Sequence, residues 1–340
     1  MSAMRDDDVV SFAESLQWQM RVCAKAGAPV AAAILGAIGD AHKTGAIPNE
    51  IDLQHRVRFG DFVPLRLLAA VHALALDRRA PHLALHLPTL GGTAGTPVTA
   101  TDIAAAFAAE AAWVNEYLHR TPQTNEVGRA HPLRIALAHL GSSQPTHLRE
   151  IGCSAGLLLN ADRMQPMPGE KVRQLPPIRS RIGFDLHPVD ASSPAGRLLL
   201  SSYVWPDHVE RFRRLGDAIV ITQKCPVDIQ VMDAASAVEQ LTLEPGTTTL
   251  VWHSALWPYL SVDGRARLER AFAAVGSTAK NKARFAVASW EVDSHAVARR
   301  LSFTLTMRTW CDGVVETQVL ATGNSHATEV AEVAAQSIDS

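Results

Sequence analysis

The stretch that most constrains this chain is residues 147–160, which read His-Leu-Arg-Glu-Ile-Gly-Cys-Ser-Ala-Gly-Leu-Leu-Leu-Asn. A short apolar strand is expected to end near Glu150, and a helix is expected to begin at about Leu157. Between them, Gly152 and Gly156 flank a turn that lets a ligand approach the backbone and the start of the following helix. The stretch lacks both the Gly-Lys-Ser/Thr ending of a P-loop and the middle glycine of the dinucleotide fingerprint. It predicts a ligand-binding turn of another kind or an ordinary strand-to-helix turn.

The periodicity of apolar residues changes at this stretch. Residues 9–139 carry apolar side chains at three- and four-residue spacing, which is typical of helices. From residue 148 onward, short apolar strands alternate with helical segments, which favours a parallel sheet with right-handed crossovers. We therefore expect an all-helical domain over residues 1–145 and an α/β domain with a doubly wound, mostly parallel sheet over residues 146–322. A small, polar and flexible tail is expected over residues 323–340.

An acidic residue ends the second expected strand of the α/β domain, at residues 181–185. Nucleotide-binding α/β folds hold a ribose diol with a carboxylate at this place, so Asp185 is a candidate ribose ligand. The alternative is that Asp185 forms a turn or caps the segment that begins near Pro188.

Aromatic residues and a histidine follow the expected strand at residues 248–253. His253, Trp257 and Tyr259 would gather at the carboxyl end of that strand, where open α/β sheets bind ligands. Such a group can stack a substrate and move a proton. It can equally be a loop that packs on the helix after Val262.

The polar segment 121–129 lies between two apolar helical patterns. It is either an interhelical loop that caps the next helix or a loop that projects Asn125, Glu126 and Arg129 into a binding site.

Bulk properties exclude several functional classes. A hydrophobic content of 47% supports a sizeable core, and a net charge of −2 gives no electrostatic reason to expect nucleic acid or membrane binding. His82 and His86 lie four residues apart but make at most an incomplete metal site, so we expect no metal. The acidic N-terminus has no apolar signal segment, and the cysteines form no Cys-x-x-Cys pair. We therefore expect a cytoplasmic protein with a small-molecule partner, and its oligomeric state stays open.

The Glu-x-Gly-x-Ser-x-Gly pattern resembles the first motif of class I S-adenosylmethionine (SAM) methyltransferases, with Ser154 where a glycine is commoner. Four segments together resemble the bacterial family known as domain of unknown function 2332: Gln-Thr-Asn-Glu-Val-Gly-Arg at 123–129, Glu-x-Gly-x-Ser-Ala-Gly-Leu at 150–157, Arg-x-Gly-x-Asp-x-x-Pro-x-Asp at 181–190 with Val-Trp-Pro at 204–206, and His-Ser-Ala-Leu-Trp-Pro-Tyr at 253–259. The resemblance extends over roughly residues 12–321. The chain departs from that family at Leu158, where asparagine is usual, and at Met164, where tyrosine is usual.

The resemblance implies a SAM-dependent methyltransferase that acts on a small molecule, with the helical domain as a lid. SAM would lie at the carboxyl ends of the parallel strands. The implied cofactor-binding residues are Glu150, Gly152, Ser154, Ala155, Gly156, Asp185, Asp233 and Ala234, with Asp233 facing the adenine amino group unless it is only a helix cap. The implied catalytic residues are His253 or Glu126 as base, together with Tyr259, and the implied acceptor-binding residues are Asn125, Arg129 and Trp257.

Two other functions fit the same residues. One is a non-catalytic protein that holds SAM, its demethylated product or another nucleotide. The other is a serine hydrolase, because residues 152–156 also satisfy Gly-x-Ser-x-Gly with Ser154 as the nucleophile. The hydrolase acid and histidine would come from later in the chain, from these residues: Asp233 or Asp263, and His295 or His326.

Overall fold

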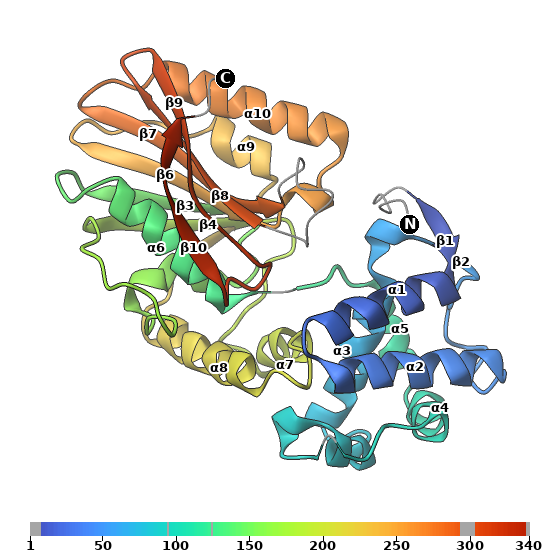
Figure 1. Cartoon of the computed structure of the whole chain (residues 1–340). Helices are drawn as coiled ribbons and strands as arrows, with labels where there is room; N and C mark the ends of the chain where they lie inside the picture. The colour runs from blue at the N-terminus through green and yellow to red at the C-terminus, as the bar shows by residue number, and fades with distance from the viewer. Residues whose placement is uncertain (1–7, 94, 124, 293–302, 338–340) are drawn as a thin grey trace. The chain divides into compact units, whose positions relative to one another are not determined.

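The computed structural model describes residues 8–93, 95–123, 125–292 and 303–337 (Figure 1). The chain forms two compact units. The first, here called the helical unit, consists of Met1–Thr124 and Ser193–Gly216, and the second, the sheet unit, consists of Asn125–Ser192 and Asp217–Ser340. The expected boundary at residue 145 therefore differs from the observed one.

The helical unit contains α1 (Phe12–Lys25), α2 (Pro29–Lys43), α3 (Val63–Leu76), α4 (Ala100–Ala109), α5 (Ala111–His119), α7 (Pro194–Ser202) and the start of α8 (Val209–Lys224), with short 3-10 helices η1 (Phe59–Asp61), η2 (Pro81–His86) and η3 (Pro88–Leu90). Its core is formed by fully buried side chains of α2 and α3, such as Ile34, Leu35 and Leu67. Helices α4 and α5 are separate, because Glu110 between them leaves the helical conformation (φ −132°, ψ 35°).

The prediction that this part is all-helical is wrong at one place. β1 (Val9–Ser11) and β2 (Arg56–Arg58) form a small antiparallel sheet. A strand of three residues is too short to show an alternating pattern in the sequence.

One stretch of the helical unit, residues 59–76, is long and apolar enough to cross a membrane by composition alone. It is weak evidence for a span, because 56% of that window is buried inside the fold and core helices have the same composition.

The segment 193–216 belongs to the helical unit because its side chains complete that unit's core. Tyr203 packs with Ala69, Ala70 and Ala73 of α3. The N-terminus of α2 has no side-chain cap of its own, and Asp207 supplies one. Its two carboxylate oxygens accept hydrogen bonds from the backbone N–H groups of residues 30 and 31 at 2.7 and 2.9 Å. The segment therefore supplies both packing and a cap to helices far away in the sequence.

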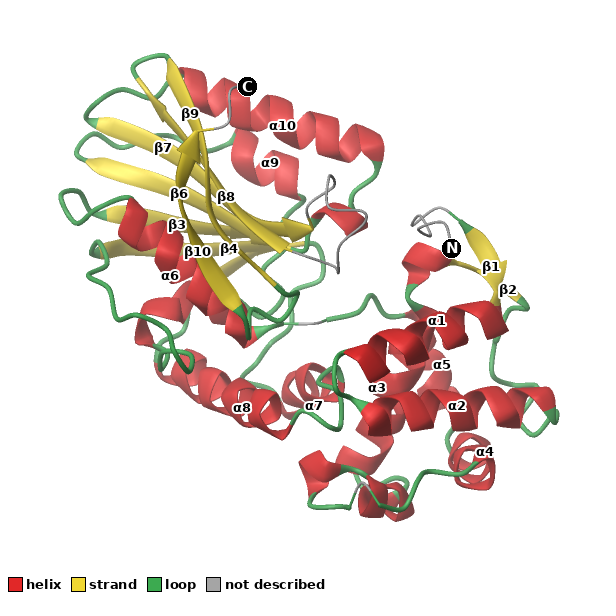
Figure 2. Cartoon of the chain, viewed as in Figure 1, coloured by secondary structure: helices red, strands yellow, loops and turns green. Residues whose placement is uncertain are grey.

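The sheet unit is built on an eight-stranded sheet in the order β10-β9-β8-β7-β6-β3-β4-β5. The strands are β3 (Thr146–Ile151), β4 (Ile178–Asp185), β5 (Asp228–Val231), β6 (Thr247–Ser254), β7 (Ala283–Val292), β8 (Phe303–Cys311), β9 (Val314–Gly323) and β10 (Val330–Ser337). The five strands from β5 to β7 in this order are parallel, and β8, β9 and β10 add an antiparallel meander (Figure 2). The expected α/β fold with a mostly parallel sheet is confirmed, whereas the expected flexible tail contains strand β10.

Helices cover both faces of this sheet. Figure 1 shows α9 (Ala234–Glu239) and α10 (Val262–Ser277) on one face and α6 (Ala130–His139) on the other. Phe272 of α10 packs with Val251, Phe285 and Val287 from the strands below it. Strand order reverses between β3 and β6, because β4 and β5 lie on one side of β3 while β6 and β7 lie on the other. In open α/β sheets, ligands bind outside the carboxyl ends of the strands at such a reversal.

Candidate functional site

The loop after β3 has a backbone that only small residues adopt easily. Gly152, Ser154 and Gly156 all have positive φ angles, of 68°, 52° and 63°. A Cβ atom at residue 152 would stand 2.8 Å from Cδ1 of Leu256, so glycine is required there by conformation and by space. The N–H groups of Gly152 and Cys153 donate to the carbonyl oxygen of Phe184 at 2.8 and 3.2 Å. These bonds hold the loop against the carboxyl end of β4.

The α-helix expected from Leu157 is a 3-10 helix, η5 (Leu157–Arg163), with a kink at Asn160 (φ −102°, ψ 21°). Residues 157–161 are all buried, so the run has no polar face that would distinguish one kind of helix from another in the sequence. Asn160, the asparagine near the family departure at Leu158, donates from Nδ2 to the carbonyl oxygen of Cys225 at 3.0 Å. A short, kinked 3-10 helix has no sizeable dipole, so the expected helix N-terminus contributes little to ligand binding.

Asp185 lies at the carboxyl end of β4, as expected, and faces the loop. Its Oδ2 accepts a hydrogen bond from the backbone N–H of Ser154 at 2.7 Å, and its Oδ1 accepts one from the N–H of His187 at 2.8 Å. The carboxylate therefore forms the turn that we considered as the alternative role. Each carboxylate oxygen can accept a second hydrogen bond, so the half-buried Asp185 retains the capacity to bind a ribose diol.

Glu150 is buried beside this loop, with only 4% of its surface exposed. Its Oε2 is buried and has no hydrogen-bond partner among the described residues. Burial raises the pKa of Glu150 well above its usual value and the negative charge of Asp185 raises it further, while Arg129 acts in the opposite direction. These effects favour the protonated acid, which can donate a hydrogen bond to a ligand.

Cys153 lies between these carboxyl groups and is 2% exposed. Burial, followed by the charges of Glu150 and Asp185, raises the pKa of its thiol far above the usual range. Cys153 is therefore an inert thiol and not a nucleophile. Ala155, the other small residue of the loop, is also buried.

Asp233 follows β5 and caps α9. Its Oδ1 accepts hydrogen bonds from the N–H groups of Ala235 and Ser236 at 3.1 and 3.0 Å. Ala234, which we expected beside the adenine, is the first residue of α9 and is half-buried. The helix-cap role of Asp233 is thus observed, and its contact with an adenine amino group stays a prediction.

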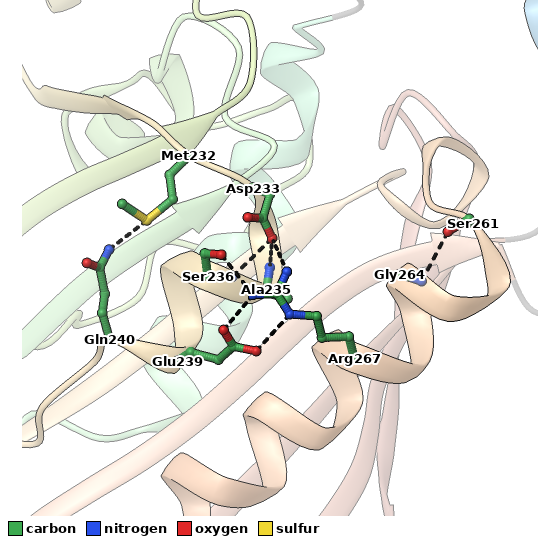
Figure 3. Close-up of polar contacts among 9 residues, drawn as sticks. All are labelled: Met232, Asp233, Ala235, Ser236, Glu239, Gln240, Ser261, Gly264 and Arg267. Atoms are coloured by element: carbon green, nitrogen blue, oxygen red, sulfur yellow. Dashed lines mark hydrogen bonds and ion pairs between the residues drawn. The ribbon is translucent and has the colours of Figure 1, made fainter.

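Arg267 of α10 holds this cap in place (Figure 3). Its guanidinium lies 3.4 Å from Oδ1 of Asp233, donates to Oγ of Ser236 at 2.9 Å and forms two bonds with Glu239 at 2.9 and 2.6 Å. Burial raises the pKa of Asp233, but the hydrogen bonds from Ser236 and the charge of Arg267 outweigh burial and lower it. Asp233 is therefore an ionised acceptor at neutral pH.

His253 lies at the carboxyl end of β6 and is 1% exposed. Its Nδ1 lies 2.8 Å from Oε1 of Glu291 at the end of β7. The same Oε1 accepts a hydrogen bond from the backbone N–H of Leu256 at 2.8 Å. A buried histidine–carboxylate pair thus connects the ends of two adjacent parallel strands.

The loop after β6 packs on α10, which is the alternative that we considered for its aromatic residues. The Trp257 ring stands edge-on to His253 with centroids 5.0 Å apart, and the Phe272 ring stacks on the imidazole at 6.2 Å. Arg265 donates from Nε to the carbonyl oxygen of Trp257 at 3.0 Å. Tyr259, in the 3-10 helix η6 (Trp257–Tyr259), is 44% exposed and so can contact a ligand.

Asn125 and Arg129 belong to the sheet unit and lie at the strand ends. Nδ2 of Asn125 donates to the carbonyl oxygen of Cys153 at 3.3 Å. Arg129, in the 3-10 helix η4 (Val127–Arg129), donates from Nη1 to the carbonyl oxygen of Ser254 at 3.3 Å and from Nε to that of Ser325 at 3.1 Å. This segment, for which both an interhelical loop and a binding-site loop were open, therefore contacts the loop after β3 and the end of β6.

Glu126 is 6% exposed and lies beside the β9–β10 turn. Its Oε1 accepts a hydrogen bond from the N–H of Gly128 at 3.1 Å, and its Oε2 lies 3.2 Å from Nδ1 of His326. A Cβ atom at residue 128 would stand 2.2 Å from the carbonyl oxygen of His326, so only glycine lets the two segments approach.

The sequence predicted no site role for Glu291 or Ser254, and it offered His326 only as a histidine of the hydrolase alternative and not as a partner of Glu126. Glu291 follows an apolar strand directly, as Asp185 and Asp233 do, and that signal was available. The contacts of Ser254 and His326 depend on segments more than 100 residues away, and no local pattern predicts them.

The acid and histidine candidates of the hydrolase alternative have other contacts or lie outside the described residues. Asp233 caps α9, His326 pairs with Glu126, Asp263 lies in the first turn of α10, and His295 lies outside the described residues.

No group of three or more His, Cys, Asp or Glu side chains that could hold a metal ion is found in the described part of the chain. His82 and His86 lie in η2, where their ring nitrogens face the backbone carbonyl oxygens of Asp102 and Thr96 at 3.4 and 2.7 Å.

Two solved structures are similar to part of this chain. One is SAM-bound CalS10, an amino pentose methyltransferase from Micromonospora echinaspora involved in calicheamicin biosynthesis, which is 13% identical, with 63% of this chain and 74% of that chain covered, at a TM-score of 0.23. The other is the sugar N-methyltransferase KedS8 from a Streptoalloteichus species, which is 11% identical, with 63% and 72% covered, also at a TM-score of 0.23. At this TM-score, neither similarity supports a conclusion about this chain.

No curated protein matches the sequence. A family model does match, and it is described as an uncharacterised protein conserved in bacteria. The matches extend over residues 13–171 and 164–332, which is most of the chain and includes every segment of the candidate site. The chain therefore belongs to the bacterial family DUF2332.

Proposed function

We propose that the sheet unit binds SAM at the carboxyl ends of β3, β4 and β5, and that the protein transfers the methyl group to a small molecule. The observation that carries this proposal is the contact between the loop after β3 and the acid that ends β4. The Ser154 N–H donates to Asp185 at 2.7 Å, which places a carboxylate directly beside a loop that requires glycine. This contact lies at the strand reversal where such sheets bind ligands.

The residues at this edge fit SAM, whose sulfonium and ammonium groups are both cationic. Glu150 and Asp185 provide acidic groups, and the buried Oε2 of Glu150 has no hydrogen-bond partner among the described residues. A bound cation would favour ionisation of that acid and so offset the cost of its burial. Gly152 leaves its backbone exposed, and Asp233 supplies an ionised acceptor near the end of β5.

When bound, SAM supplies an electrophilic methyl group on a good leaving group, so the protein mainly has to position the acceptor in line with it. Within this proposal, the exposed Tyr259 contacts the acceptor, together with Asn125, Arg129 and Trp257. His253 or Glu126 takes a proton where the acceptor must lose one. We place the acceptor among small molecules because the net charge of −2 does not favour a nucleic acid.

One observation favours a second candidate, a non-catalytic protein that binds SAM. Two of the three proposed catalytic residues, His253 and Glu126, are buried and paired with Glu291 and His326, respectively. These pairs can be structural, in which case the same site would hold SAM without turning it over.

The test is calorimetric titration of the full-length protein with SAM and with S-adenosylhomocysteine, in parallel with Asp185→Ala. We expect binding in the micromolar range, and we expect Asp185→Ala to weaken it by about tenfold or more, which corresponds to at least about 1.4 kcal/mol. If neither compound binds, the SAM assignment is wrong. If both bind, formation of S-adenosylhomocysteine in the presence of amine, hydroxyl and carboxylate acceptors separates the enzyme from the binding protein.

A further inference from the structure

We propose that Glu291 is a positioning residue of the methyl transfer: it holds His253 in the tautomer whose Nε2 can take a proton from the acceptor. The inference rests on the proposed function for its catalytic consequence, but its structural part can be measured without any ligand.

The geometry around Glu291 joins three segments at one oxygen atom. Oε1 lies 2.8 Å from Nδ1 of His253 and 2.8 Å from the backbone nitrogen of Leu256. Glu291 is 6% exposed and His253 is 1% exposed, so solvent competes little for these bonds. Glu291 therefore fixes both the imidazole and the start of the loop that carries Trp257 and Tyr259.

The shared oxygen determines the tautomer of His253. Because Oε1 already accepts a hydrogen bond from the Leu256 N–H, it acts as an acceptor toward Nδ1 as well. Nδ1 must then carry a hydrogen, and in the neutral ring Nε2 is left with a lone pair. This is the arrangement by which a carboxylate orients a histidine base.

Glu291 has a second carboxylate oxygen that can stabilise a positive charge formed on His253 during the reaction. The second oxygen of Glu291, Oε2, is buried and has no hydrogen-bond partner among the described residues. A buried carboxylate with an unsatisfied oxygen is costly unless a positive charge stands beside it. The rings of Trp257 and Phe272 beside the imidazole are uncharged. Two cations lie in the neighbourhood: Arg308, whose guanidinium lies over the Phe272 ring at 5.2 Å, and Arg129, which donates to the carbonyl oxygen of Ser254 at 3.3 Å. An imidazolium formed at His253 during the reaction would stand directly beside the Glu291 carboxylate.

In the proposed step, the lone pair of the acceptor atom forms a bond to the methyl carbon, and the electron pair of the broken carbon–sulfur bond stays on sulfur. The proton of the acceptor passes to Nε2 of His253, and it then returns to solvent. Glu291 stabilises the resulting imidazolium and stays ionised. The ring of Trp257 stands edge-on to His253, with the ring centroids 5.0 Å apart.

The same unit contains a matched control pair. His147, near the amino end of β3, contacts Glu244 with Nε2 at 3.0 Å from Oε2. This histidine–glutamate pair lies at the opposite end of the strand from the candidate site, and the Glu244 side chain is 45% exposed. Glu244→Gln therefore removes the same charge from a similar pair that the proposal gives no role.

The experiment compares wild type, Glu291→Gln, Glu291→Leu and Glu244→Gln in the full-length protein. Nitrogen-15 NMR of the imidazoles should show a hydrogen on Nδ1 of His253 in wild type and in Glu291→Gln, whose carbonyl oxygen can still accept. Glu291→Leu should give a mixture of tautomers, and the Leu256 amide should exchange faster with solvent. In methyl transfer, we expect kcat to fall about tenfold in Glu291→Gln and about 100-fold in Glu291→Leu, with KM nearly unchanged.

Each outcome decides the proposal. If Nδ1 of His253 carries no hydrogen in wild type, or if both Glu291 variants keep the wild-type tautomer and kcat, Glu291 does not position His253. If Glu291→Leu does not fold, Glu291→Gln should still lower kcat about tenfold with KM nearly unchanged, because the imidazolium formed in the reaction has lost its counter-charge. If Glu244→Gln lowers kcat equally, the effect is a general one of charge, and the proposal is wrong. If the NMR result holds but no acceptor is methylated, the proposed function fails while the positioning of His253 stands.

Discussion

Replacement of Asp185 by asparagine tests the candidate site most directly. The carboxylate accepts one hydrogen bond on each oxygen, from the N–H groups of Ser154 and His187. An asparagine has only one acceptor oxygen, so its amide NH2 would face one of these two N–H donors. One of the two hydrogen bonds is lost, and the other is now accepted by a neutral amide oxygen instead of a carboxylate oxygen.

The expected free-energy changes follow from these contacts. A hydrogen bond to a charged group contributes about 1.5–3 kcal/mol, and the half-exposed position of Asp185 favours the lower end of that range. The weakening of the second bond adds about 0.8 kcal/mol, since neutral hydrogen bonds are roughly half as strong. Asp185→Asn should therefore lower the free energy of unfolding by about 2 kcal/mol. The same arithmetic applied to two ribose hydroxyls, about 2 kcal/mol, gives an affinity loss of about 30-fold.

The assay combines urea denaturation with calorimetric titration of SAM and S-adenosylhomocysteine. The control is Asp162→Asn, because Asp162 accepts two hydrogen bonds from Arg181 of β4 at 2.7 and 2.8 Å and has no proposed ligand role. Both variants should lose stability, and only Asp185→Asn should lose affinity. If Asp185→Asn folds normally and both affinities stay within about twofold of wild type, the ribose assignment is refuted.

Three further predictions concern stability. Gly156→Ala should lower the free energy of unfolding by about 1–2 kcal/mol because of its left-handed backbone, and further because two aliphatic side chains lie 3.0 Å from the new Cβ. Gly169 also has a positive φ but has open space around it, so Gly169→Ala should cost only the backbone contribution. Chemical denaturation of the two variants measures the difference. Arg134→Met should lower stability by about 3–5 kcal/mol at neutral pH, since it leaves Glu170 buried without its partner. Burial raises the pKa of Glu170, but the hydrogen bonds and charge of Arg134 outweigh burial and lower it. The difference in free energy of unfolding between wild type and Arg134→Met should therefore shrink as pH falls below 4.5. Urea denaturation at several pH values measures this difference. Burial lowers the pKa of His72 from 6.5 to about 4, so the unfolded chain binds a proton more readily than the folded chain. The free energy of unfolding of wild type should therefore fall by about 3 kcal/mol as pH falls from 6.5 to 4. If the free energy of unfolding of a His72→Asn variant falls equally steeply over this pH range, His72 is not the cause.

The parts of the site that the sequence predicted are those built by local chemistry. The turn after β3 was recognisable because glycines and a single acid interrupt apolar residues, and the structure has positive φ angles at Gly152 and Gly156. Asp185 was recognisable because it ends a short apolar strand and parallel strands bring their carboxyl ends to one edge. These features depend on a few neighbouring residues, so a single sequence contains them.

The parts that the sequence did not predict depend on distant partners. Glu291 gains its role only because β6 and β7 pair in register and bring His253 beside it from 38 residues away. The α-helix expected after Gly156 is a 3-10 helix, since every side chain from 157 to 161 is buried and gives no period to measure. The domain boundary was placed at residue 145 because helical spacing continues to residue 139, although α6 packs on the sheet.

The cap on α2 has a consequence for the order in which the protein matures during synthesis. Asp207 binds the N–H groups of Val30 and Ala31, and it is 177 and 176 residues away from them in sequence. A nascent chain that has emerged only as far as the end of β4 therefore holds an uncapped α2 and an α3 whose alanine face has no Tyr203 to cover it. The helical unit is complete only after translation has passed residue 216, when three strands of the sheet, β5, β6 and β7, are still to be made before β8 begins. A chaperone or a protease at the ribosome would consequently meet the N-terminal helices without their cap and cover until residue 216 has been made.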